Sequence, residues 1–208
     1  TYTDLIEQRE TNVINEDLNR AFCLLNQGSK RAKKLLDALN IYLAFQKSLR
    51  SSENTELELV IVSVRSHLRD LISKRNAAIR LHSNLKVKID FRHIKFILQC
   101  LVENAIHFNK SVRPIVEIKC NRLEKYWFYS VEDNGIGVAK GSRTEIFEPF
   151  KRFNTKLHQG VGMNLATCKM LIEELYGGEI WVESEVGKGS TFFFTCDLSF
   201  NEKAKENF

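Results

Sequence analysis

One short group of residues combines a carboxylate with closely spaced glycines. Asp133 follows a stretch of alternating apolar residues, and Gly135 and Gly137 follow two and four residues later. A carboxylate at the end of a strand can accept a hydrogen bond from a flat ligand, and glycines allow the backbone to approach that ligand closely. Because the same residues also form ordinary turns, this group alone leaves a ligand pocket and a simple turn both open.

A second pair of glycines, Gly160 and Gly162, opens a stretch with helical periodicity. Backbone N–H groups at such a helix start converge on anions, and the helix dipole favours negative charge there. Ahead of these glycines, residues 146–153 combine aromatic side chains with Lys151 and Arg152. Such a segment suits either a flap that closes over phosphates or a turn that packs its aromatic residues on the core.

An amide lies within an apolar helical stretch at Asn104, and His107 follows three residues later near the same side of that helix. A polar amide in this position is either a satisfied core residue or a contact to a ligand. A single histidine in such a stretch is more often structural than catalytic. Neither residue identifies a function by itself.

The apolar periodicity predicts which elements hold these groups. Residues 16–45 carry Leu18, Phe22, Leu25 and further apolar residues at steps of three and four, which predicts a long amphipathic helix whose apolar side needs a partner helix. The short polar stretch 50–56 predicts a linker. Further helices are expected over 57–74, 91–108 and 162–176, and strands over 78–81, 87–89, 115–121, 126–131, 179–185 and 190–198.

This order of elements predicts an α+β fold. We expect a two-layer α/β sandwich with a mostly antiparallel mixed sheet, preceded by a long helix. The expected boundaries are residues 1–49 for the helical segment, 50–56 for the linker, 57–200 for the mixed domain and 201–208 for a polar tail.

Composition narrows the classes of protein that fit. Lys and Arg outnumber Asp and Glu by 31 to 26, but the charges are scattered rather than gathered into a basic stripe, so we expect no nucleic acid partner. The net charge of +5 suits an anionic ligand. No apolar stretch approaches the roughly 18 residues of a membrane span, so no membrane contact is expected in this segment. The five cysteines lie far apart, which predicts reduced thiols in a cytoplasmic protein without a zinc site.

Together, and in this order, the groups resemble the N, G1, F and G2 boxes of the ATP-binding domain of sensor histidine kinases, in the wider family shared with gyrase, Hsp90 and MutL. The matching segments are LVENAIHF, VEDNGIG, IFEPFKRF and GVGMNLATCKMLIEELYGGEIWVESEVGKGSTFFFT. The resemblance covers roughly residues 57–198 and is closest to the kinase ends of bacterial phytochromes and hybrid sensor kinases. It implies a Bergerat-type ATP-binding fold. More loosely, residues 17–45 resemble the second helix of a dimerisation hairpin, so residues 1–49 are expected to be a dimerisation segment.

The resemblance implies roles for individual residues in binding ATP and Mg²⁺. Asn104 would bind the Mg²⁺ ion that bridges the ATP phosphates, Phe108 would lie against the adenine, and Asp133 would accept a hydrogen bond from the adenine amino group. Gly135 and Gly137 would shape the pocket floor. The residues implied at the phosphates are His107, Arg152, Gly160, Gly162 and Asn164, and Thr191 would supply a hydroxyl near the adenine.

Three positions depart from the family pattern. His107 stands where Lys or Arg is usual, and a neutral imidazole would weaken the contact to phosphate. Asn164 replaces the third glycine of the G2 box. Cys100 replaces an Asn of many kinases and the water-activating Glu of the gyrase, Hsp90 and MutL branch, which disfavours self-contained ATP hydrolysis.

The resemblance implies transfer of the ATP γ-phosphate to a histidine and then to the receiver domain of a response regulator, in a homodimer joined through the N-terminal helix. None of the five histidines lies within residues 1–49, so the phosphoacceptor is expected outside this segment or on another chain, or it does not exist. Two alternatives remain open: a degenerate module that signals through helix pairing without phosphotransfer, and an ATPase clamp similar to MutL or Hsp90.

Overall fold

The computed structural model describes residues 18–26, 28–29, 32–33, 36, 39–41, 43–45, 54–151 and 162–197. The chain divides into two compact units, Thr1–Asn40 and Ile41–Phe208. The described residues of the first unit are helical, as the apolar periodicity predicts. Leu18, Phe22 and Leu25 of this unit have exposed side chains. The pairing of this helix in a dimer stays a prediction.

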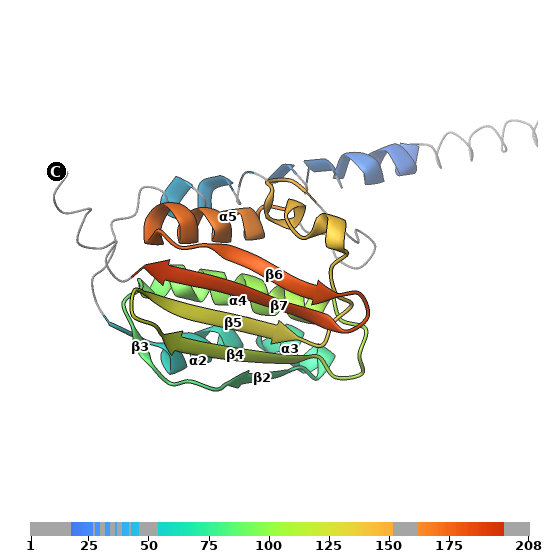
Figure 1. The fold of residues 1–208 in the computed structure, drawn as a ribbon. Helices are drawn as coiled ribbons and strands as arrows, with labels where there is room; N and C mark the ends of the chain where they lie inside the picture. Colours follow the sequence, from blue (N-terminus) through green and yellow to red (C-terminus); the bar gives the residue numbers. More distant parts are fainter. Residues whose placement is uncertain are drawn as a thin grey trace, which may run out of the picture. The chain divides into compact units, whose positions relative to one another are not determined.

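A five-stranded sheet forms one layer of the second unit (Figure 1). Its strands are β2 (Ala78–Leu81), β4 (Ile115–Arg122), β5 (Tyr126–Asp133), β6 (Ile180–Glu185) and β7 (Gly189–Asp197). They lie in the order β2-β4-β5-β7-β6, and all neighbours are antiparallel except the parallel pair β2 and β4. A separate antiparallel ribbon joins β1 (Thr55–Glu56) to β3 (Lys86–Val87).

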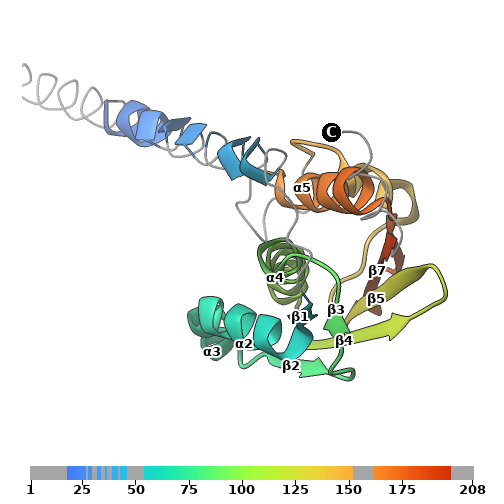
Figure 2. The ribbon, with the colours of Figure 1, turned by 90° about the vertical axis from the view of Figure 1, so that its left-hand side faces the viewer.

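Helices cover one face of this sheet and form the second layer (Figure 2). They are α2 (Leu57–His67), α3 (Arg69–Arg75), α4 (Phe91–His107) and α5 (Asn164–Met170), which continues as η3 (Leu171–Leu175). Two 3₁₀ turns, η1 (Lys140–Ser142) and η2 (Glu145–Phe147), lie between β5 and α5 in the chain. The predicted two-layer α+β sandwich is confirmed. Within the part of the chain that the structure describes, no helix is both long and apolar enough to span a membrane.

The pleat of the central strands sorts their side chains between the two faces of the sheet. In β5, Trp127, Tyr129 and Val131 are buried in the core, whereas the residues between them are partly exposed. Tyr129 stacks on Phe194 of β7 with ring centroids 4.4 Å apart. This apolar layer fixes the position of β5, and so it determines where the residues that end this strand lie.

Several boundaries differ from the expectations. The helix expected over 57–74 breaks at Leu68, whose backbone angles (φ −95°, ψ 14°) separate α2 from α3. The linker expected over 50–56 is shortened, because its last two residues form β1 and pair with β3. The Thr55 hydroxyl secures this ribbon by donating a hydrogen bond to the Ile89 carbonyl at 2.6 Å. The helix expected from residue 162 begins at Asn164.

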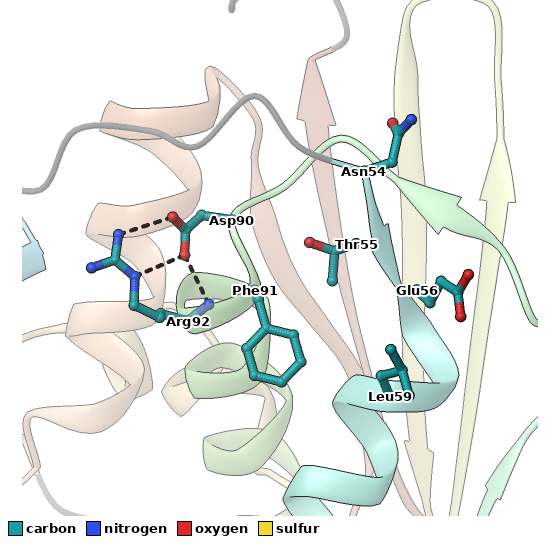
Figure 3. A pocket seen from close by; sticks show the side chains of 7 residues that line it. All are labelled: Asn54, Thr55, Glu56, Leu59, Asp90, Phe91 and Arg92. Atoms are coloured by element: carbon teal, nitrogen blue, oxygen red, sulfur yellow. Dashed lines mark hydrogen bonds and ion pairs between the residues drawn. The ribbon is translucent and has the colours of Figure 1, made fainter.

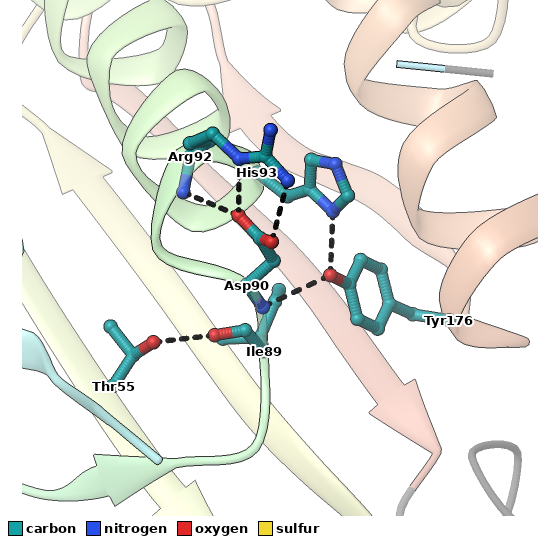
Figure 4. Close-up of polar contacts among 6 residues, drawn as sticks. All are labelled: Thr55, Ile89, Asp90, Arg92, His93 and Tyr176. Atoms are coloured by element: carbon teal, nitrogen blue, oxygen red, sulfur yellow. Dashed lines mark hydrogen bonds and ion pairs between the residues drawn. The ribbon is translucent and has the colours of Figure 1, made fainter. Parts of the chain in front are cut away.

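A buried polar network joins the start of α4 to the end of the α5–η3 helix (Figure 4). The Tyr176 hydroxyl accepts a hydrogen bond from the Asp90 N–H at 3.1 Å and lies 2.7 Å from Nδ1 of the buried His93. Asp90 caps α4 by accepting from the Arg92 N–H, and the two side chains form an ion pair at 2.9 Å. Burial opposes the ionisation of Asp90, but its hydrogen bonds with Arg92 prevail and lower its pKa.

We expect Tyr176→Phe to destabilise the domain by about 1–3 kcal/mol, because the change removes a hydroxyl that two buried groups share as a hydrogen-bond partner. Urea unfolding followed by circular dichroism measures the effect. Tyr126→Phe is the matched control, since Tyr126 is 39% exposed, and its unfolding midpoint should equal that of the wild type. Equal midpoints for both variants would contradict a structural role for the network.

Candidate functional site

The end of α4 and the residues after β5 are in direct contact. Phe108 caps the C-terminus of α4, and its carbonyl oxygen accepts a hydrogen bond from the Ile136 N–H at 2.9 Å. Asp133 ends β5, and its Oδ1 accepts from the Gly135 N–H at 2.7 Å. A Cβ atom at residue 135 would lie 2.6 Å from Asp133 Oδ1 and 2.7 Å from the Phe108 carbonyl oxygen, so only glycine fits. Phe108 and Asp133, both predicted at one pocket, are thus brought together.

The turn between β6 and β7 holds the other side of this loop. Gly137 adopts a positive φ of 72°, and a Cβ atom there would overlap the Glu185 carbonyl oxygen. The Gly187 N–H donates a hydrogen bond to the Ile136 carbonyl at 2.9 Å. The loop with the two predicted glycines is therefore fixed between the end of α4 and the β6–β7 hairpin.

The Asp133 carboxyl group is half-buried. Burial raises its pKa to about 6, although hydrogen bonds from the backbone N–H groups of Gly135 and Ser190 favour the ionised form. A carboxylate in a low-dielectric environment gains more from a ligand donor than one in water. Asp133 is therefore suited to accept a hydrogen bond from a flat ligand that carries an amino group.

The predicted amide and histidine of α4 have different surroundings. Asn104 lies one helical turn before Phe108, and its side chain is half-buried. The imidazole of His107 lies beside Glu103 of the same helix, with Nε2 3.6 Å from Oε1. Helix geometry therefore places the amide on the side of α4 that carries Phe108, whereas the histidine faces a carboxylate.

The segment between β5 and α5 is described as far as residue 151 and again from residue 162. The Phe150 N–H donates a hydrogen bond to the Gly162 carbonyl at 2.9 Å, which ties the two described ends together. Gly162 has a positive φ of 79°, and Asn164 is exposed at the first position of α5. Arg152 and Gly160 lie outside the described residues, so their roles stay predictions.

The hydroxyl group on the same face of the sheet as Asp133 is not the one predicted. Asp133 pairs with Ser190 across β5 and β7, whereas Thr191 pairs with Glu132. Because side chains alternate between the faces of a sheet, Thr191 lies on the face opposite Asp133. The structure thus corrects the prediction, since the buried Ser190 lies on the face of Asp133. Cys196 indicates which residues of β7 face the core. It is buried and lies six positions after Ser190, and therefore on the same face of the sheet.

Cys100 lies one turn before Asn104 on α4 and contacts Cys168 of α5. A hydrogen bond with the Cys168 thiol, together with burial, raises the pKa of Cys100 well above its usual value. A thiol that stays protonated cannot take a proton from water. At this position α4 therefore offers no general base, as the sequence predicts.

Binding of a metal ion at this site would require a bound phosphate-containing molecule. Among the described residues, no group of three or more His, Cys, Asp or Glu side chains could hold a metal ion. Mg²⁺, however, is usually held by one or two protein oxygens together with ligand phosphates and water. The amide oxygen of Asn104 fits this pattern, because it needs phosphate oxygens to complete the coordination.

A surface pocket of about 540 Å³ lies at the opposite end of α4 (Figure 3). Its lining residues are Asn54, Thr55, Glu56, Leu59, Asp90, Phe91 and Arg92. Asn104 lies 14 residues after Asp90, which corresponds to about 20 Å along the helix. The charged groups of the pocket are already paired, Glu56 with Lys86 and Asp90 with Arg92. This pocket is therefore separate from the site around Asp133.

Residues 89–199 match the family model described as "Histidine kinase-, DNA gyrase B-, and HSP90-like ATPase". The chain belongs to this family. It is 32% identical over 207 residues to Cyanobacterial phytochrome A from Nostoc sp. strain PCC 7120, and the match covers 99% of this chain and 27% of that protein. The chain thus spans about a quarter of the length of this relative.

Solved structures of histidine kinases share the fold. The catalytic domain of histidine kinase ThkA is 28% identical with a TM-score of 0.58, and the match covers 70% of this chain and 97% of that chain. A complex of ThkA with response regulator protein TrrA is 24% identical with a TM-score of 0.65, covering 84% of this chain and 50% of that chain. At this lower identity the likeness shows the fold alone. Membership in this ATPase family supports ATP as the ligand of the site around Asp133.

We expect Gly135→Ala to weaken ATP binding about tenfold or more, because the added methyl group collides with the Asp133 carboxylate and the end of α4, and overpacking costs about 1–3 kcal/mol. Isothermal titration calorimetry measures the affinity. Gly141→Ala is the matched control, since no surrounding heavy atom lies within 4 Å of its added methyl group. Equal affinities for the two variants would show that the close contact does not shape the ATP site.

The raised pKa of Asp133 predicts that ATP affinity falls as the pH drops through about 6, because protonation turns the carboxylate into a weaker acceptor. The folded state binds this proton more tightly than the unfolded chain. Asp133 therefore contributes fully to stability below its ordinary pKa of 3.8 and loses that contribution as the pH rises from there through about 6. Asp133→Asn separates this titration from that of the ATP phosphates. Identical pH profiles of affinity for the wild type and this variant would contradict the assignment.

Proposed function

We propose that this chain is the ATP-binding catalytic part of a sensor histidine kinase, which transfers the γ-phosphate of ATP to a histidine outside this segment and from there to a response regulator. The observation that supports this most is the contact that joins Phe108 to Asp133 around Gly135. Because the chain spans about a quarter of its phytochrome relative, the activity of the whole protein is part of the proposal.

In this proposal, β5 and α4 bind ATP together. Asp133 accepts a hydrogen bond from the adenine amino group, and Phe108 lies against the adenine ring. Asn104 binds Mg²⁺ together with the phosphates. Mg²⁺, when bound, neutralises charge on the phosphate that is transferred. The protein therefore contributes mainly position and electrostatics, as is usual in phosphoryl transfer.

The phosphates extend toward the residues that precede α5. The backbone N–H group of Gly162 is proposed to donate to them, and the dipole of the following helix adds to the attraction. Gly160 and Arg152, which lie outside the described residues, are proposed to bind the phosphates as well. His107 and Asn164 are the remaining residues proposed to contact the phosphates. The exposed position of Asn164 leaves its amide accessible to them.

Transfer to a histidine fits the site better than hydrolysis of ATP. Hydrolysis needs a group that activates water, whereas an acceptor imidazole is itself a nucleophile. Cys100 cannot activate water, because its thiol is buried and hydrogen-bonded to Cys168. Glu103, the carboxylate of α4, faces His107, with its Oε1 3.6 Å from Nε2 of the imidazole. The site is therefore suited to hold ATP for an acceptor that arrives from outside.

The partners follow from the same proposal. We propose a homodimer through the N-terminal helix, because exposed apolar residues such as Leu18 and Leu25 need a partner helix. No histidine lies within residues 1–49, so the phosphoacceptor is proposed on a helix outside this segment. The proposed recipient is a receiver domain, by analogy with ThkA, which forms a complex with response regulator TrrA. The free cysteines support a cytoplasmic location.

A second candidate function is a degenerate kinase module that binds ATP weakly and signals through helix pairing. His107 favours this candidate, since its imidazole faces Glu103 in place of the usual Lys or Arg that contacts phosphate. The strength and the Mg²⁺ dependence of ATP binding separate the two functions.

Titration with a fluorescent ATP analogue, with and without Mg²⁺, tests the proposal. The wild type should bind in a Mg²⁺-dependent manner, and Asn104→Ala should remove that dependence. Asp133→Ala should weaken binding by about 10–100-fold without unfolding the domain, since a hydrogen bond to a charged group contributes about 1.5–3 kcal/mol. A wild type without Mg²⁺-dependent binding would reject the kinase proposal. Steady ATP turnover by this chain alone would favour an ATPase instead.

A further inference from the structure

We propose that Asn109 and Asn134 form an amide clamp that holds the adenine slot at a fixed width and thereby selects adenine over guanine. The inference rests on the ATP site proposed above. Each asparagine directly follows one of the two residues assigned to the adenine, since Asn109 follows Phe108 and Asn134 follows Asp133. A bond between the two asparagines therefore fixes the separation of the two adenine contacts.

The Asn134 side chain joins three segments of the chain. Its Oδ1 accepts hydrogen bonds from Asn109 Nδ2 and from the Ile115 N–H, both at 2.8 Å. Its Nδ2 donates to the Arg113 carbonyl at 3.2 Å. Because both the acceptor and the donor of the amide are used, the side chain has one preferred orientation. The loop after β5 is thereby tied to the end of α4 and to the start of β4.

Asn109 holds the other half of the clamp and is 3% exposed. Its Oδ1 accepts a hydrogen bond from the Ser111 N–H at 2.7 Å, so its Nδ2 stays directed at Asn134. Its backbone carbonyl accepts from Arg75 Nη2 at 2.6 Å. Since Arg75 is the last residue of α3, the clamp is anchored in the helical layer of the domain.

Adenine and guanine differ at the ring position that Asp133 would contact. Adenine carries an amino donor there, whereas guanine carries a carbonyl acceptor. A carboxylate held at hydrogen-bond distance attracts the first group and repels the second, and this discrimination requires a fixed distance. If the loop after β5 could shift, water would enter between Asp133 and the base, and the discrimination between adenine and guanine would be lost. The two asparagines are therefore positioning residues that act through Asp133 and Phe108.

Two variants remove the donor that reaches Asn134: Asn109→Ala and the isosteric Asn109→Asp, which keeps the acceptor for Ser111. Calorimetry with Mg²⁺ measures the affinities for ATP, GTP and inorganic tripolyphosphate. ATP affinity should fall about tenfold, the effect of one lost hydrogen bond. GTP and tripolyphosphate affinities should not change, so the preference for ATP over GTP also falls about tenfold. Asn121→Ala, at an exposed asparagine of β4, is the matched control and should keep that preference.

A purely structural role predicts a different result. In that case the melting temperature falls, and the affinities for the three ligands either fall together or do not change. An unchanged preference for ATP over GTP would overturn the clamp. Combining Asn109→Ala with Asn134→Ala should weaken ATP binding by less than the sum of the two single losses, because both variants lack the bond between Asn109 and Asn134. Additive losses would also overturn the clamp. A wild type that does not bind ATP would overturn the proposed function, and the clamp with it.

Discussion

The candidate ATP site depends on one close backbone contact, where the loop after β5 meets the end of α4. The Ile136 N–H reaches the Phe108 carbonyl at 2.9 Å because residue 135 has no side chain. Sheet and helix each deliver one residue to this point, since β5 ends in Asp133 and α4 is capped by Phe108. The apolar layer between sheet and helices holds both elements in place. In the proposed site, recognition of the base would therefore rest on core packing as much as on the groups that contact it.

The elements that carry the site could be predicted from local sequence patterns. The apolar residues of 91–108 follow a helical period and those of 126–131 alternate, and each pattern agrees with the burial that the fold imposes. Four short motifs resemble those of the family in their order and spacing, and this resemblance agrees with the match over residues 89–199. Long periodic elements are predictable because local pattern and tertiary packing require the same residues.

The features that escaped prediction depend on contacts between residues distant in the chain. The two-residue strand β1 exists only through its pairing with β3, and two residues carry no period. Three consecutive phenylalanines in β7 hide which residues face the core, so the sequence predicts Thr191 instead of Ser190 as the hydroxyl group near the adenine. The bond between Asn109 and Asn134 spans 25 residues and follows from the tertiary fold alone. In the helix expected over 57–74, Leu68 gives no local sign of a break.

The anchoring of the first turns of α4 has a mechanical consequence. Phe45 packs edge-on against His93 and Phe96, with ring centroids 5.1 and 5.0 Å apart, while Asn104 lies near the far end of the same helix. α4 runs for 17 residues without glycine or proline, so nothing in its sequence promotes a kink. Such a helix is rigid along its length. A small displacement of its N-terminal turns would therefore also shift its C-terminal turn and change the position of Asn104 in the site.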